Sequence, residues 1–547
     1  MLDPETVPVV VGVGRYTQKR GTPILEALSP IDIMAWTCRL AGRDATDSFY
    51  SSLHLLKQVD AVAVVQSATE ARICHKFPRG LGTNISPNWP KSLGKAVGIK
   101  DLPWERCYQT YDGGNSSQML INSMAEKISN KEIRSVLVSG CEVLSTLMSA
   151  LSKGEIGAAQ IREKWNEPLA SSKTPVRVGP EYCDTEVEIK HGLHVPIRVY
   201  PLFEQAYRSS LDLSVEDHML NQSKMFSGFS KVAAENPEHS WFPTERSPED
   251  IASPNSRGNK WVGYPYTKYH CAVMNVDQSA SVIIMSEAEA MRRGISKSKW
   301  IYLHGCADTI EKMTLRRPQL HRSPAMRIMG REVAKASNIG SMDMIKYKDI
   351  YSCFPIAVSV VARELGFDPK DGTKLTLTGG LPYHGGPGSN YSLHGLVALA
   401  SKLRADPGSY GLITANGGYF NKHSAGIYST TPYHITHPNA VKWSRMNPKS
   451  YQCELDNGPE VKLSNCPEGL GTVETYTVVH KGKGNEYRGI VIGKLNESQE
   501  RFVATSNDTK LMRIMKSREF LGQQVNVSTD NHTGISTFRT NIVNSSL

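Results

Sequence analysis

The sequence predicts an α/β protein made of two similar halves, an inserted region between them and a separate all-β domain after them. Three observations support this prediction. Strands of the buried type alternate with amphipathic helices, a glycine-rich loop followed by a helix and a strand occurs twice, and residues from about 443 onward alternate polar with β-branched side chains. At 547 residues the chain is too long for one ordinary core, so we expect two or three packed units.

The composition is that of an ordinary globular protein, with 39% hydrophobic and 21% charged residues. No stretch approaches the roughly 18 consecutive apolar residues of a membrane-spanning helix, so we expect no membrane span. The formal net charge of +10 suits phosphorylated ligands. It comes without a dense Lys/Arg run or an aromatic-basic ladder, which argues against nucleic acid as a main partner.

The N-terminus has neither a basic flank nor an apolar core, so we expect no signal peptide. Ten cysteines are scattered without a C-x-x-C pair or a metal-like cluster. This usage is typical of a reducing compartment, with free and mostly buried thiols and no metal site.

The first half begins with three strands of the buried type. Val9–Val13, ended by Gly14, predicts a buried parallel strand, and two more are predicted at 59–65 and 135–140. Ser29 and Pro30 predict the N-cap and first residue of an amphipathic helix that runs to about residue 40.

The repeat is the most informative feature. Gly113–Ser116 opens a helical stretch that runs to about residue 128 and precedes the strand at 135–140. Gly385–Asn390 opens another, through residue 403, followed by the strand Tyr410–Ala415. A duplicated fold explains the shared glycine pair, with chance similarity of two βα units as the alternative.

The pattern changes twice more. Residues 146–265 are rich in Pro, Glu, Lys and His and predict an inserted cap or loop domain with short helices, such as one at 202–211. Later, Thr472–Val479, the turn Lys481–Asn485 and Arg488–Gly493 predict a hairpin in a closed antiparallel β-barrel. The expected domains are residues 1–145, 146–265, 266–431 and 443–547.

The segments around Gly114, Tyr351, Gly386 and Ala415 resemble thiolases over about residues 7–430. The resemblance is greatest to the sterol-carrier-protein-2 type and to the thiolase-like proteins of type 1, whose appended β-barrel the last domain resembles. It implies a duplicated, layered α/β/α/β/α thiolase fold with an inserted loop domain.

Three further landmarks carry this resemblance. Val282–Ala288 is similar to the strand and helix start that follow the loop domain in thiolases. Tyr351–Phe354 stands where these enzymes carry an Asn-Glu-Ala-Phe or His-Asp-Cys-Phe loop, and Gly385–Pro387 stands where they carry Gly-His-Pro.

The resemblance also implies that thiolase (acetyl-CoA acyltransferase) activity is lost. Thiolases need a thiolate nucleophile, an acid/base and oxyanion donors. The nucleophilic cysteine falls on Gly114, the Asn or His on Tyr351, the His of Gly-His-Pro on Gly386, and the acid/base cysteine on Ala415. None of these four residues supplies the side chain that its role requires.

Six other positions remain candidates by resemblance. Cys353 matches a catalytic acid/base or fills a tight loop, and His384 either swings inward or is an ordinary loop histidine. The candidate CoA contacts are Phe354, Met274, Gly417 and Gly418. Core packing is the alternative explanation for Phe354 and Met274, and steric need is the alternative for the two glycines.

The leading expectation is a protein that binds CoA or acyl-CoA as a ligand, with no covalently bound cofactor. The alternative is an active acyltransferase in lipid metabolism that uses Cys353 with His384, and a third possibility is an interaction role for the barrel. The resemblance allows a monomer or a homodimer. The terminal Ser545–Leu547 is similar to a peroxisomal address, with the cytosol or mitochondrion as alternatives.

Overall fold

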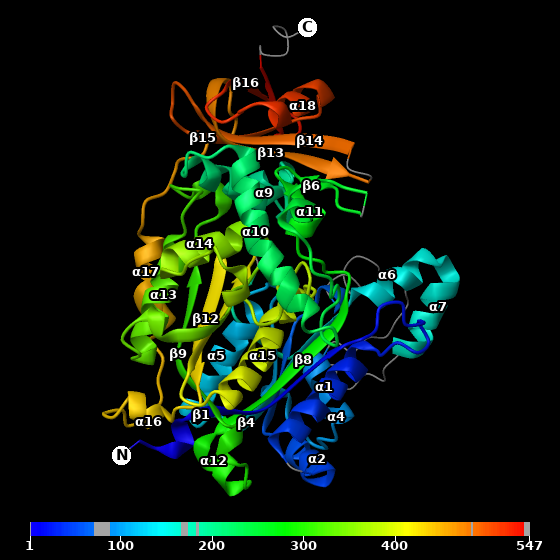
Figure 1. Ribbon diagram of the computed structural model, residues 1–547, viewed down its shortest axis with the longest axis vertical. Coiled ribbons are helices and arrows are strands. Elements are labelled where there is room, and N and C mark those ends of the chain that lie inside the picture. Colours follow the sequence, from blue (N-terminus) through cyan, green and yellow to red (C-terminus); the bar gives the residue numbers. More distant parts are fainter. Residues whose placement is uncertain are drawn as a thin grey trace.

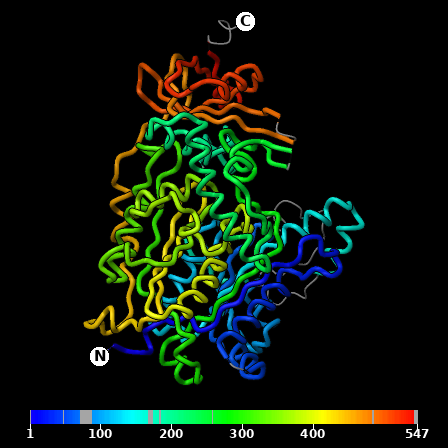
Figure 2. Tube along the Cα trace, in the orientation of Figure 1, coloured from blue at the N-terminus to red at the C-terminus, as the bar shows by residue number. Residues whose placement is uncertain are grey.

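The computed structural model describes residues 2–46, 48–70, 88–165, 173–181, 185–256, 258–482 and 485–540. Figure 1 shows a large α/β body with the C-terminal β-domain, in orange and red, stacked on one end, and Figure 2 shows the same division along the chain trace. The last seven residues, including the expected peroxisomal address at 545–547, lie outside the described part. Among the described residues no helix is long and apolar enough to cross a membrane.

The body is built on a ten-stranded mixed sheet, in the order β10-β11-β12-β9-β1-β8-β4-β2-β3-β5. Its strands are β1 (Pro8–Thr17), β2 (Ala61–Val65), β3 (Cys107–Thr110), β4 (Ser135–Val143), β5 (Val176–Val178), β8 (Asp277–Ser286), β9 (Ile301–Ile310), β10 (Ile345–Asp349), β11 (Tyr410–Gly417) and β12 (Lys422–Ser429).

The sheet confirms the predicted duplication. In the first half β2 pairs parallel with β4, β4 antiparallel with β8, and β8 antiparallel with β1. In the second half β10, β11, β12 and β9 repeat the same order and the same directions. The two halves join where β1 pairs antiparallel with β9.

The predicted parallel direction of the first strand is wrong. β1 is buried over Pro8–Gly14, as expected, but it is antiparallel to both of its neighbours and continues past Gly14 to Thr17. A run of valines indicates that both faces of a strand are buried, but it does not indicate the direction of the strand relative to its neighbours. The neighbours of β1 come from distant parts of the chain.

The helices pack on both sides of the sheet and inside the body. They are α1 (Pro30–Ala45), α2 (Phe49–Lys57), α4 (Trp89–Ala96), α5 (Ser116–Ser129), α6 (Leu144–Ser152), α7 (Gly154–Trp165), α8 (Glu186–Lys190), α9 (Pro196–Ser209), α10 (Val215–Ala234), α11 (Pro248–Ala252), α12 (Glu287–Arg292), α13 (Pro324–Ser337), α14 (Pro355–Leu365), α15 (Tyr391–Ala405), α16 (Tyr433–Thr436), α17 (Pro448–Asp456) and α18 (Thr509–Ser517). The predicted start of α1 is confirmed, with the Ser29 side chain accepting from the Asp32 backbone N–H.

The two helices of the repeat, α5 and α15, lie at the centre of the body and are buried along most of their length. Each contacts strands of both halves, and they contact each other. Their glycine-rich entry loops also meet, because the Gly113 N–H donates to Ser389 Oγ at 3.1 Å. The fold therefore brings both halves of the repeat to one place.

The inserted region supplies α6–α11 and three short strands, β5 at the edge of the large sheet, β6 (Trp261–Gly263) and β7 (Tyr266–Thr267). The predicted helix at 202–211 corresponds to the C-terminal part of α9, which begins earlier, at Pro196. Apolar residues of α9 and α10, such as Phe203 and Phe226, join one core with α13 and α14 of the second half. The insert is thus packed onto the second half.

The C-terminal domain is a ring of five strands, β13 (Gly469–Lys481), β14 (Asn485–Leu495), β15 (Arg501–Ser506), β17 (Ser536–Arg539) and β16 (Gln524–Thr529), in that spatial order. The predicted β13–β14 hairpin is confirmed. The predicted all-antiparallel closure is wrong at one pairing, because β15 and β17 run parallel. Strand β6 of the insert pairs with β13 and extends the sheet beyond the ring.

Candidate functional site

The loop before α5 brings Gly114 to the place expected for a nucleophile, and there is no room for a side chain there. A Cβ atom on Gly114 would overlap the Tyr351 hydroxyl and the backbone carbonyl oxygen of Asn416. Tyr351 follows β10, and Asn416 lies near the end of β11. Three segments that are distant in sequence therefore close this position, which excludes a cysteine without rearrangement.

Tyr351 occupies the vacated space as a neutral phenol. Its backbone N–H donates to Thr414 Oγ1 at 3.1 Å, and its ring packs edge-on against Tyr391 with centroids 5.4 Å apart. Burial raises the pKa of Tyr351 well above its usual value. The hydroxyl is held protonated, so it can donate a hydrogen bond but is a poor base.

The other two emptied positions differ from Gly114. Gly386 has space, since a Cβ atom there would meet Leu381, Val273 and Ala272 at 3.4–3.5 Å, an ordinary contact distance. Ala415 is buried within β11 and pairs with Ser424 across the sheet. Gly386 therefore has room for a Cβ atom, which Gly114 does not.

A thiol does approach this chamber, from Cys353. The Asn416 Nδ2 group donates to Tyr200 Oη at 2.8 Å and lies 3.6 Å from Cys353 Sγ. Burial raises the pKa of Cys353 to about 12, and its hydrogen bonds with Tyr200 and Asn416 offset only part of that. The thiol is therefore protonated near neutral pH and is a weak nucleophile.

His384 is not brought to Cys353. Its Nε2 atom lies 3.3 Å from Nδ1 of His394 on α15, and its ring packs against Tyr391 at 6.1 Å. Burial lowers the pKa of His384 well below its usual value, and the neighbouring His394 and Arg15 lower it further. Tyr391 stands between His384 and Tyr351, so the predicted pair does not form a catalytic dyad here.

The aromatic position Phe354 is filled by packing. Its ring stacks on Tyr200 at 4.4 Å and on Tyr266 at 5.4 Å, and it is only 3% exposed. Tyr200 comes from α9 in the inserted region. No sequence motif marked Tyr200, because only the docking of the insert onto the second half brings it here.

The remaining candidate contacts divide between surface and steric roles. Met274 is 38% exposed beside the Gly386 loop, so the expectation that it packs in the core is wrong. A Cβ on Gly417 would overlap the Asn115 side chain, and Gly418 has a φ of +62° at the turn between β11 and β12. Both glycines are therefore required by the backbone geometry.

Two buried polar atoms at this chamber have no hydrogen-bond partner within the described ranges. They are the amide oxygens Asn115 Oδ1 and Asn416 Oδ1. Sequence reasoning assigned no role to Asn416 or to Asn115, whose only signals were their places beside Ala415 and after the glycine pair. Buried polar groups are normally satisfied, so the chamber suits a polar guest or water.

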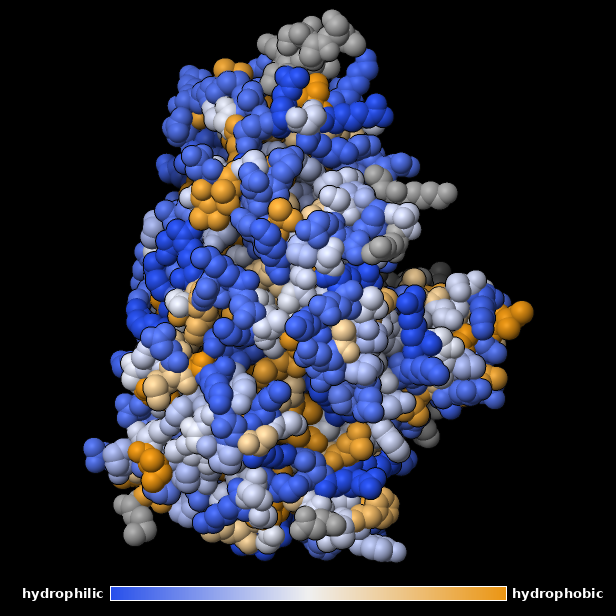
Figure 3. Space-filling model, in the orientation of Figure 1, coloured by the Kyte–Doolittle hydropathy of each residue, from blue (hydrophilic) through white to orange (hydrophobic). Residues whose placement is uncertain are grey.

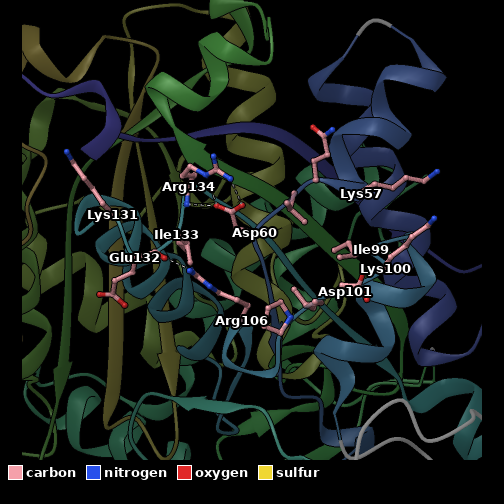
Figure 4. A pocket seen from close by; sticks show the side chains of 15 residues that line it. Lys57, Asp60, Ile99, Lys100, Asp101, Arg106, Lys131, Glu132, Ile133 and Arg134 are labelled. Atoms are coloured by element: carbon pink, nitrogen blue, oxygen red, sulfur yellow. Dashed lines mark hydrogen bonds and ion pairs between the residues drawn. The ribbon is translucent and has the colours of Figure 1, made fainter.

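A separate hollow of about 710 Å³ lies at the opposite edge of the sheet, where β2, β3 and β4 begin. Its rim is basic, but three of these cations already have partners. Arg134 pairs with Asp60, and Arg106 donates to the backbone carbonyl oxygen of Glu132 (Figure 4). Lys131 forms an ion pair with Asp3. None of the candidate site residues lines it. On the face drawn in Figure 3, hydrophilic residues predominate and hydrophobic ones show mainly in the middle of the lower part.

Two comparisons with known proteins agree on what this chain resembles. Residues 451–532 match the family model of the additional C-terminal domain of thiolase-like protein type 1. A monomeric SCP2-thiolase-like protein type 1 from Mycobacterium smegmatis is 29% identical, with a TM-score of 0.78 over 98% of this chain and 100% of that one. The chain is therefore similar to the type 1 thiolase-like proteins, both over its full length and in its additional C-terminal domain.

Other solved structures share the fold of this thiolase-like protein. The dimeric peroxisomal thiolase of Saccharomyces cerevisiae is 14% identical, with a TM-score of 0.53 over 78% of this chain and 98% of that one. An Ltp2-ChsH2(DUF35) aldolase is 17% identical, with a TM-score of 0.52 over the same 78% and 98%. No match was found among curated protein sequences.

Proposed function

We propose that this thiolase-like protein binds CoA or an acyl-CoA thioester without thiolase turnover. The observation that carries the proposal is the closure of the Gly114 position by Tyr351 and Asn416 next to buried, unpartnered polar atoms. Such a chamber retains hydrogen-bonding capacity for a polar ligand and lacks the group that would attack it.

The chemistry supports binding over catalysis. An acyl-enzyme needs a thiolate at the helix entrance, and no side chain fits there. A carbonyl oxygen of a bound thioester could accept from the protonated Tyr351 hydroxyl, since the raised pKa keeps that proton in place. We also propose that the backbone N–H groups of Gly417 and Gly418 can donate to this thioester oxygen.

The alternative, an acyltransferase based on Cys353, has one favourable observation: its thiol lies at the chamber. It lacks a base, because His384 is bonded to His394 and the pKa of Cys353 is raised to about 12. The geometry therefore favours the binding role.

Titration calorimetry with CoA, acetyl-CoA and long-chain acyl-CoAs tests the proposal. We expect saturable binding of at least one of them and no thiolysis or acyl transfer across the same panel. Absence of binding up to millimolar ligand would contradict it.

Two variants separate binding from hidden catalysis. Cys353→Ala should leave the thioester turnover at background, as should the control Cys306→Ala, a buried cysteine in β9. Turnover that disappears in Cys353→Ala alone would establish the acyltransferase alternative.

The oligomeric state proposed here is a monomer, as named for the Mycobacterium smegmatis relative. The outer strand of the first half, β3, is paired in parallel with the short strand β5 from the inserted region. An edge that already has a partner is unavailable for pairing with a second copy.

Peroxisome-like import through Ser545–Leu547 is a further proposal, made from the sequence alone. A fluorescent fusion to the N-terminus of the full chain should collect in peroxisomes, and removal of the last three residues should return it to the cytosol. An unchanged distribution would contradict the proposal.

A further inference from the structure

The side chain of Arg15 places a positive charge inside the body of the protein. It lies on β1, on the face opposite Gly12 and Gly14, whose Cβ positions are closed by the backbone of α1. The other face of β1 packs against α15. Within the described ranges the buried Nη1 atom of Arg15 has no hydrogen-bond partner, and Asp349 interacts with the guanidinium only at a distance.

The charge of Arg15 acts on two fully buried histidines, one of which is carried by α15, the helix that contacts β1. His384 and His394 are 0% exposed and share one contact, Nε2 of His384 to Nδ1 of His394 at 3.3 Å. Their other ring nitrogens, Nδ1 of His384 and Nε2 of His394, have no partner among the described residues. Two buried, unpartnered ring nitrogens therefore lie within the electrostatic reach of the Arg15 guanidinium.

The hydrogen-bond count of the histidine pair is the same for either tautomer. If His384 donates to His394, the pair retains one N–H donor on His394 and one lone pair on His384; if His394 donates, these are exchanged. Arg15 adds guanidinium donors in a fork. The cluster therefore offers several donors and one acceptor to a guest.

The electrostatics of the cluster are positive. The Arg15 charge and burial lower the pKa of His384, of His394 and of the half-buried His239, the last to about 4. The facing carboxylate is Asp349: its Oδ2 atom is held by the backbone N–H groups of Leu377 and Thr378, and its buried Oδ1 atom has no hydrogen-bond partner among the described residues. The Tyr391 phenol on the same side is neutral, because burial raises its pKa well above the usual value.

We infer that Arg15, His384 and His394 form a binding site for a small oxyanion, a carboxylate or a phosphate. An oxyanion would accept from the Arg15 fork and from the free histidine N–H. It would also neutralise a part-buried guanidinium whose Nη1 atom has no hydrogen-bond partner among the described residues. The site is separated from the chamber at Gly114 by the Tyr391 ring and does not depend on the proposed CoA binding.

Anion binding should be accompanied by proton uptake. A bound negative charge favours the charged form of a neighbouring imidazole, so the depressed pKa of the pair must rise on binding. Calorimetric titration of the full chain near neutral pH with inorganic phosphate, and separately with malonate, measures this in two buffers of different ionisation enthalpy. We expect saturable one-site binding of at least one anion, and the tighter of the two identifies phosphate or carboxylate as the preferred chemistry.

The matched variants are Arg15→Gln and Arg20→Gln. Arg20 is exposed five residues along the chain and stacks on Phe242 at 5.3 Å, so it controls for the loss of one positive charge nearby. We expect Arg15→Gln to weaken anion binding at least tenfold and Arg20→Gln to leave it unchanged. Equal binding by wild type and Arg15→Gln would overturn the inference.

If Arg15→Gln does not fold, measurements on the wild-type protein still test the inferred anion site. Phosphate or malonate should raise its Tm more than sodium chloride of the same ionic strength, and binding should take up protons. No saturable heat with either anion, or a Tm that follows ionic strength alone, would show that the cluster holds only water.

Discussion

Replacing Gly114 by alanine should destabilise the protein by about 2 kcal/mol or more, because the added methyl has no space. One of the atoms that it would overlap is a backbone carbonyl oxygen, of Asn416, which cannot move without shifting β11. The other is the hydroxyl of the buried Tyr351. Chemical denaturation monitored by circular dichroism measures the change.

Gly386→Ala is the matched control, since its neighbours stand at contact distance. We expect a change within about 0.5 kcal/mol. In the background Gly114→Ala, Tyr351→Phe should recover part of the loss by removing one overlapping atom, a coupling that a double-mutant cycle detects. Equal stability of Gly114→Ala and wild type would mean that the chamber is open, and the argument for a lost nucleophile site would fail.

Replacing Arg501 by alanine should loosen the C-terminal domain by about 3 kcal/mol. Arg501 is 1% exposed, and its Nε atom pairs with Glu474 Oε2 at 2.7 Å inside the β-ring domain. Its Nη1 atom also donates to the carbonyl oxygens of Leu315 and Arg317 in the thiolase body. Truncation leaves these acceptors unpaired at the junction. Thermal unfolding, with limited proteolysis of the connection between α17 and β13, measures the effect.

Lys494→Ala controls for the loss of a cation beside the same carboxylate. Lys494 lies 3.8 Å from Glu474 and is much more exposed than Arg501, so we expect a change of less than about 0.5 kcal/mol. Similar effects of the two substitutions would mean that the buried contacts to the body contribute little to docking.

The junction also bears on the interaction role considered for this domain. Val479, Ile490, Ile492 and Val503 on its strands belong to the same core as α9 and α14 of the body. Residues of the ring interior, such as Tyr476 and Phe502, form a separate core. The outward apolar face of β13–β15 is thus used for docking onto its own thiolase-like body.

Local signals were sufficient for several elements. The Ser29-Pro30 start of α1, the two glycine-rich entries to α5 and α15, and the β13–β14 hairpin were all predicted correctly, because caps, glycine loops and turn residues act over a few positions. The direction of β1 and the parallel β15–β17 pairing were missed, since neither is encoded near the strands concerned.

The sequence by itself determined which side chains are absent: no sulfur or imidazole stands at Gly114 or Ala415, whatever the fold. Only the tertiary structure decided what takes their place. Tyr351 and Asn416 close one position while Gly386 stays roomy, and Cys353 and His384 are held on different sides of two tyrosine rings. These outcomes depend on contacts between segments far apart in the chain, which no local pattern records.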